Sequence, residues 1–171
     1  NSGFTITSTG AQTINSTAWE ARDSNGSTDG VGVILGVEIS GATGAGTPTI
    51  TVAYTNSANT ASRSGVNSVA TVASSAVGTF YPIGLQAGDV GVQSVQSVTL
   101  GTSTATAGNF GLTIRKPIAM YPLPAANIGQ KWGYAETGLS VVPTDACLEL
   151  LVLASTTSTG PIFSPAKRWK H

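Results

Sequence analysis

Short stretches in which apolar and polar residues alternate recur along the chain and predict β-strands. The clearest alternation runs over residues 31–40, where the apolar positions on one side are Val31, Val33, Leu35, Val37 and Ile39. Residues 50–54 resume the alternation after a glycine-rich interval at 41–48, so the two stretches are expected to pair as an antiparallel hairpin with an exposed tip. The alternation at 110–115 predicts a further strand.

Residues 81–103 carry the longest valine-rich pattern in the chain. A tight turn is expected at 86–89, and after it the apolar positions Val90, Val92, Val98 and Leu100 share one parity. We therefore predict one strand with a core face and a polar face. The polar face is a candidate assembly surface, and its residues are Gln93, Ser94, Gln96 and Ser97.

Three other segments are less regular. Strand-like pieces within residues 1–18 predict an edge strand or an arm laid on a neighbouring molecule. Residues 66–77 are rich in Val, Ala and Ser, which favours a strand over a helix. Residues 147–154 are apolar on both sides of an extended chain, which is typical of a strand that is central in a sheet or covered by another subunit. Cys147, at the start of that strand, is expected to be a small buried apolar side chain.

The segment from Lys116 to Asp145 differs in composition. It contains prolines at 117, 122, 124 and 143, together with the aromatic residues Tyr121, Trp132 and Tyr134. Flexible linkers lack such anchors, so we expect a long ordered connection pinned to the core. In the alternative interpretation, these three aromatic side chains are exposed and contact a sugar.

About eight short strands without helical periods between them predict an all-β fold, an antiparallel β-sandwich or jelly roll. The long Pro- and aromatic-containing connection and extended terminal arms complete this picture. A chain of 171 residues has room for one domain. We expect an N-terminal arm or edge strand at 1–18, a single domain at 19–155 and a C-terminal tail at 156–171.

Composition narrows the possible partners. Charged residues are only 9% of the chain, and 8 Lys and Arg balance 8 Asp and Glu, so no overall field attracts nucleic acid or an anionic membrane. The one local basic patch is a candidate contact at the C-terminus, formed by Lys167, Arg168, Trp169 and Lys170. No apolar run reaches the length of a membrane span, and a single cysteine excludes an intramolecular disulfide framework.

The inventory of reactive side chains is poor. The single histidine is the terminal His171, so a nucleophilic triad has no positioned base. Four carboxylates could in principle converge as an acid pair, but no pattern brings them together: Glu38, Asp89, Glu136 and Glu149. The motif at 23–29 has some of the oxygen ligands of a calcium loop but lacks the distal Glu, so a β-turn loop is favoured. We therefore predict no catalytic, cofactor-binding or metal residues.

Several segments resemble small β-rich virion proteins of tailed bacteriophages. The resemblance is carried by residues 54–63 (YTNSANTASR), 85–100 (LQAGDVGVQSVQSVTL), 115–118 (RKPI) and 146–151 (ACLELL). It implies a non-enzymatic structural protein on the outer capsid surface, a decoration or cement protein whose partners are the major capsid protein and copies of itself, often as a homotrimer. The alternative that it implies is a neck, tail or fibre component, which would act as a carbohydrate- or receptor-binding β-sandwich.

Overall fold

The computed structural model describes residues 3–106, 108–122, 142 and 147–152. The chain divides into two compact units, Asn1–Pro117 and Ile118–His171. No helix occurs among the described residues, and the eight strands all belong to the first unit. We call this first unit the barrel.

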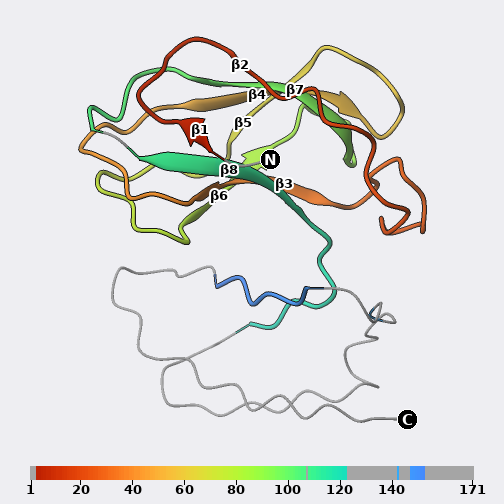
Figure 1. The fold of residues 1–171 in the computed structure, drawn as a ribbon. Coiled ribbons are helices and arrows are strands. Elements are labelled where there is room, and N and C mark those ends of the chain that lie inside the picture. The colour runs from red at the N-terminus through yellow and green to blue at the C-terminus, as the bar shows by residue number, and fades with distance from the viewer. Residues whose placement is uncertain (1–2, 107, 123–141, 143–146, 153–171) are drawn as a thin grey trace. The chain divides into compact units, whose positions relative to one another are not determined.

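The eight strands form one antiparallel sheet that is nearly closed into a barrel. Their bounds are β1 (Phe4–Thr5), β2 (Gln12–Thr13), β3 (Ile34–Ile39), β4 (Ile50–Asn56), β5 (Arg63–Asn67), β6 (Phe80–Gly84), β7 (Val92–Leu100) and β8 (Asn109–Arg115). Their order in the sheet is β1-β8-β3-β6-β5-β4-β7-β2. Figure 1 shows β8, β3 and β6 on one wall and β4 and β7 on the opposite wall. The all-β antiparallel class expected from the sequence is confirmed.

The two edge strands, β1 and β2, meet at the seam of the barrel through one side chain. The Thr5 backbone N–H donates to Gln12 Oε1 at 2.9 Å, and Gln12 Nε2 donates to the Thr5 carbonyl at 2.8 Å. The Gln12 amide therefore offers the same donor and acceptor that a neighbouring strand would offer. It covers polar groups of an edge that would otherwise be open to another chain.

Buried apolar side chains from β3, β4, β6, β7 and β8 fill the barrel, together with Ile6. The alternation predicted for 31–40 is confirmed at Leu35, Val37 and Ile39, which are at most 3% exposed. The strand begins later than expected, because Val31 makes only an isolated bridge to Gly91.

Strand β7 departs from the predicted parity. Val90 is 64% exposed and precedes the strand, whereas the unpredicted Val95 is buried with Val92 and Val98. Buried positions three residues apart cannot arise from a regular strand, whose side chains alternate. The cause lies in the pairing with β4.

Two β-bulges explain the three-residue spacing. Ala53 and Tyr54 of β4 pair with Ser97 and Val95, so Gln96 has no partner, and a second register shift omits Gln93 in the same way. Each glutamine is the extra residue of a bulge. Without these two insertions, the repeat Val-Gln-Ser-Val-Gln-Ser-Val would read as a plain Val-Ser alternation.

The predicted hairpin between residues 31–40 and 50–54 is wrong. β3 pairs with β6 and β8, whereas β4 pairs with β5 and β7. Their connection, residues 40–49, crosses the end of the barrel instead of making a tight turn. It is fastened to other loops on the way: the Thr43 N–H donates to the Ser75 carbonyl at 3.1 Å, and the Gly46 N–H donates to the Thr104 carbonyl at 3.2 Å.

The strand predicted over 66–77 ends at Asn67. At Asn67 the side chain, and not the backbone, bonds to β4: its Oδ1 accepts from the Ile50 N–H at 2.7 Å, and its Nδ2 donates to the Val69 carbonyl at 2.6 Å. Val69 and Val72 then lie in a loop and are 48% and 57% exposed. The valine content favoured a half-buried strand, but these valine side chains are exposed in the loop.

In the second unit, the prediction for residues 147–154 is wrong over the described part. Residues 147–152 are not in a strand, and Leu148 and Leu150 are each 67% exposed. Cys147 is exposed instead of buried. An apolar sequence favours burial, but burial also needs neighbouring strands, and the eight-stranded sheet is built entirely from other residues.

Candidate interaction surface

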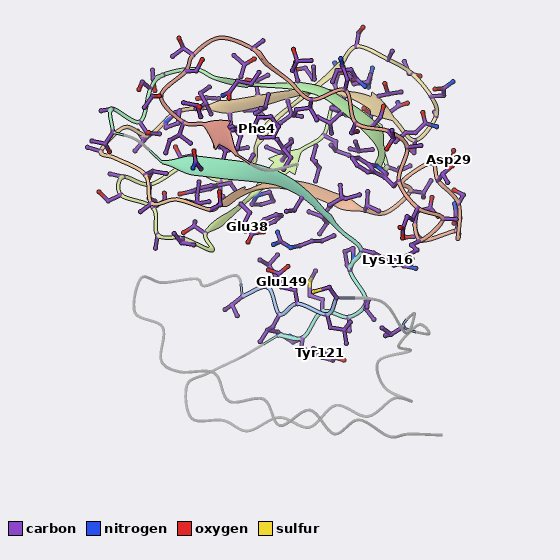
Figure 2. All side chains as sticks on the ribbon, in the orientation of Figure 1. Phe4, Asp29, Glu38, Lys116, Tyr121 and Glu149 are labelled. Carbon is purple, nitrogen blue, oxygen red and sulfur yellow. The ribbon has the colours of Figure 1, made fainter. Side chains whose placement is uncertain are left out.

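One end of the barrel carries no charged residue. The pairings Ile50 with Leu100 and Ile39 with Phe110 place four connections at this end: residues 6–11, 40–49, 68–79 and 101–108. We call them the uncharged loop end. The charged residues of the barrel are Glu20, Arg22, Asp23, Asp29, Glu38, Arg63, Asp89, Arg115 and Lys116, none of which lies in these loops. Figure 2 shows Asp29 and Lys116 at the opposite end of the barrel.

Hydrogen bonds lock the loops of this end to one another. Thr43 and Ser75 exchange two bonds, since the Ser75 N–H also donates to Thr43 Oγ1 at 2.8 Å. The Thr104 N–H donates to the Ile6 carbonyl at 3.1 Å, which ties the β7–β8 loop to the β1–β2 loop. A surface ordered in advance loses less conformational entropy when it binds a partner.

The same end exposes apolar side chains. Within the β5–β6 loop, Val69, Val72 and Val77 are 48%, 57% and 64% exposed. A groove of about 460 Å³ lies at the same end, lined by Thr5, Thr7, Gly41, Ala42, Gly108 and Asn109. This end therefore exposes methyl groups, hydroxyl groups and backbone polar groups, which can form an interface without charged residues.

At the other end, a buried carboxylate holds three segments together. Asp89 Oδ2 accepts from Tyr54 Oη at 2.5 Å and from Arg63 Nε at 2.9 Å. Its Oδ1 accepts from Asn56 Nδ2 at 2.7 Å and from Arg63 Nη2 at 3.0 Å. Tyr54 Oη in turn accepts from the Gln86 N–H at 2.8 Å, at the start of the turn that ends with Asp89. The network joins β4, β5 and the β6–β7 turn.

The electrostatics of this network stabilise the ionised carboxylate. Hydrogen bonds from Arg63 and then Tyr54 lower the pKa of Asp89 to about 2, against the opposing effect of burial. Burial and the bond to Asp89 raise the pKa of Tyr54, and the same carboxylate raises the pKa of Arg63. Both oxygens of Asp89 are occupied by donors of the same chain, so the network is a structural clamp.

The calcium-like motif at 23–29 is organised by hydrogen bonds within the chain. Asp23 Oδ1 accepts from the N–H groups of Asn25 and Ser27, and its Oδ2 accepts from Ser27 Oγ and the Val31 N–H. Burial raises the pKa of Asp23, but these four bonds outweigh it and hold the pKa well below its usual range. The motif is thus a turn built around an anion.

A third polar group lies on the outer face of β3 and β8. Arg115 Nη2 donates to Glu38 Oε2 at 3.0 Å, and the Arg115 guanidinium stacks 3.8 Å from the centre of the Phe80 ring. Within the barrel, the two carboxylates considered for an acid pair, Glu38 and Asp89, therefore do not converge. Glu38 and Asp89 each bind their own arginine, Glu149 belongs to the second unit, and Glu136 lies outside the described residues.

The predicted assembly surface on β7 is half-buried at all four positions, Gln93, Ser94, Gln96 and Ser97. The N-terminal segment of the same chain lies along this strand, since the Ile14 N–H donates to the Gln96 carbonyl at 2.8 Å. Gln96 Nε2 donates to Thr55 Oγ1 at 3.2 Å, and Gln93 Nε2 donates to Asp29 Oδ1 at 3.4 Å. Both glutamines are therefore bulge residues whose side chains make hydrogen bonds within the barrel.

The other candidate residues are placed only in part. Tyr121 is 38% exposed in the second unit, whereas Trp132 and Tyr134 lie outside the described residues. The basic residues Lys167, Arg168, Trp169 and Lys170 also lie outside them. The alternation of apolar and polar residues did not indicate the uncharged loop end, although the sequence contains its signal: residues 39–62, 64–88 and 90–114 lack any charged residue. The two charges that interrupt these runs, Arg63 and Asp89, neutralise each other.

Metal ligands, membrane helices and known relatives give no further indication of function. Among the described residues, no three His, Cys, Asp or Glu side chains gather as they would around a metal ion. No helix in that part of the chain is long and apolar enough to cross a membrane. Comparison with protein families, with curated proteins and with solved structures gave no match.

Proposed function

We propose that this chain is a non-enzymatic virion structural protein of a tailed phage, a capsid decoration or cement protein that bridges and stabilises neighbouring capsid subunits. It would sit on the outer capsid surface, with the major capsid protein and copies of itself as partners, as in a homotrimer. We also propose that the flattened barrel is a variant of the sandwich or jelly-roll class expected from the sequence.

The observation that carries this proposal is a contrast: the charged side chains of the barrel have partners within the chain, whereas large apolar side chains are exposed to solvent. The ion pairs Arg22 with Glu20, Arg63 with Asp89 and Arg115 with Glu38 account for six of the charged side chains of the barrel. Asp23, Asp29 and Lys116 also make hydrogen bonds within the barrel. Large apolar side chains are left exposed in both units, which favours a role in contact with other proteins.

Leu148 and Leu150 are the best candidates for contact with the capsid. Both are 67% exposed, and both lie in the segment 146–151 that resembles phage virion proteins. Burying an exposed leucine side chain contributes on the order of 1.5–3 kcal/mol at a well-packed interface. Two such side chains in one short segment are enough to influence binding measurably.

The test adds the purified full-length chain to mature capsids that lack a decoration protein. We expect it to sediment with the capsids and to raise their melting temperature. Replacement of Leu148 and Leu150 by Ser should weaken this binding, whereas Val90→Ser, which changes a similarly exposed side chain in the barrel, should not. Binding to isolated tails but not to capsids would refute the decoration role and favour the neck, tail or fibre alternative.

A carbohydrate- or receptor-binding role is the second candidate, favoured by the groove whose lining includes Thr5, Thr7 and Asn109 and by the 38% exposure of Tyr121. Hydroxyl and amide groups are common in sugar sites, and so are exposed aromatic rings. Here these two features belong to different units, so each is tested by its own variant. A glycan array probed with the wild type, with Trp132→Ala and with Asn109→Ala tests this role. Binding that one of the variants abolishes would support it, and no binding by the wild type would eliminate it.

A further inference from the structure

We propose that the uncharged loop end is the surface through which copies of this chain associate, with the partner being the same end of a second copy. The inference rests on the proposed structural role and names the partner of one particular surface. It is independent of what the assembled copies then bind.

The first argument is electrostatic. If a charged surface of a partner packed against the uncharged loop end, the partner's charged groups would lose their hydration without gaining an opposite charge. That desolvation is costly. The described loops at this end carry no charged residue, so a favourable partner is uncharged as well. The same end of a second copy meets this requirement, and two such ends do not repel each other as two charged patches would.

The second argument is the combination of exposed methyl groups with a rigid frame. The three exposed valines of the β5–β6 loop supply apolar area, with Val77 the most exposed at 64%. The bonds between Thr43 and Ser75 hold this loop against the β3–β4 loop before any partner binds. Burial of these side chains is therefore gained with little ordering of the backbone.

The third argument is symmetry. Most soluble homo-oligomers use closed symmetry, and like ends that meet around a rotation axis need surfaces that are compatible with copies of themselves. A surface of small uncharged side chains satisfies that condition, because methyl and hydroxyl groups pack against their own kind without pairing of opposite charges. The opposite end, which carries Asp29 and Lys116, lacks this uniform character (Figure 2).

Sedimentation velocity of the full-length chain alone, over a range of protein concentrations, tests the inference. We expect a species at a multiple of the 17.2 kDa chain mass. Val77→Asp should raise the dissociation constant at least tenfold, because association would bury an unpaired charge. Val90→Asp is the matched control, since Val90 is also 64% exposed but follows Asp89 at the other end, and it should leave association unchanged.

A second measurement, cysteine cross-linking, tests the association even if the Asp substitutions perturb the fold. In a Cys147→Ser background, Val77→Cys should be joined between two chains by a short bis-maleimide, and Val90→Cys should not. A 17.2 kDa species at every concentration, or equal effects of the two Asp variants, would overturn the inference. Because capsids are absent from both experiments, failure here is distinct from failure of capsid binding.

Discussion

The Asp89 clamp allows a quantitative test through Tyr54→Phe. The Tyr54 side chain is 0% exposed, so the substitution keeps the buried ring and deletes only the hydroxyl. That hydroxyl donates to Asp89 at 2.5 Å and accepts from the Gln86 N–H at 2.8 Å. One lost bond involves a charged group and the other is neutral, so the free energy of unfolding should fall by about 3 kcal/mol.

Tyr81→Phe is the matched control in the same core. Its hydroxyl lies 2.5 Å from Ser75 Oγ and accepts from the Val72 N–H at 3.1 Å, so both of its bonds are neutral. We expect a loss of about 2 kcal/mol at pH 7. Urea denaturation of the three proteins, with an unchanged slope, measures both differences.

The pH dependence separates the two variants more sharply than the magnitudes do. The pKa of Asp89 is about 2 in the folded protein and 3.8 in the reference carboxyl, so its contribution to stability is complete above about pH 5 and is lost as the pH falls from there toward 2. Removing the Tyr54 hydroxyl raises the folded pKa of Asp89. The stability gap between wild type and Tyr54→Phe should therefore narrow between about pH 5 and pH 2.

The gap for Tyr81→Phe should stay constant over the same range, because neither of its partners is a carboxylate. A Tyr54→Phe gap that stays constant with pH would refute the assignment of Asp89 as an ionised clamp. A loss below about 1 kcal/mol at pH 7 would refute it as well, because water would then be replacing the two bonds.

Two further predictions concern the bulges and the seam. Deletion of Gln96 should leave a folded barrel, because Val95 and Ser97 would then follow the regular alternation. Deletion of Thr99, which pairs regularly with Thr51, should instead prevent cooperative unfolding. Circular dichroism melting curves distinguish the two variants, and equal loss of stability in both would contradict the bulge assignment. Gln12→Ala should raise the hydrogen-exchange rate of the Thr5 backbone amide several-fold, because it removes the side-chain acceptor of that N–H at the seam. Gln93→Ala, which removes a glutamine side chain away from the seam, is the control. Unchanged exchange at Thr5 would show that the seam does not depend on the Gln12 side chain.

Much of the candidate surface could have been predicted from composition along the chain. The runs without charged residues at 39–62, 64–88 and 90–114 are visible in the sequence, and so are the two isolated charged residues that separate them, Arg63 and Asp89. Their convergence could not be predicted. It depends on β3 pairing with β6 and β8 instead of β4, which sends the loop 40–49 across the barrel end to meet residues 75 and 104.

The sequence by itself determined the strands β3, β4 and β8 and the turn at 86–89, because alternation and turn chemistry are local properties that neighbouring residues decide. The apolar stretches at 66–77 and 147–152, which lack that clean alternation, did not form the expected strands. The tertiary structure alone decided three things: which strands pair, where Gln93 and Gln96 interrupt the alternation of β7, and which end of the barrel is uncharged. The Asp89 clamp shows the reason, since its partners Tyr54 and Arg63 are 35 and 26 residues away in the chain. Contacts of that span depend on the closure of the whole sheet, which no local pattern records.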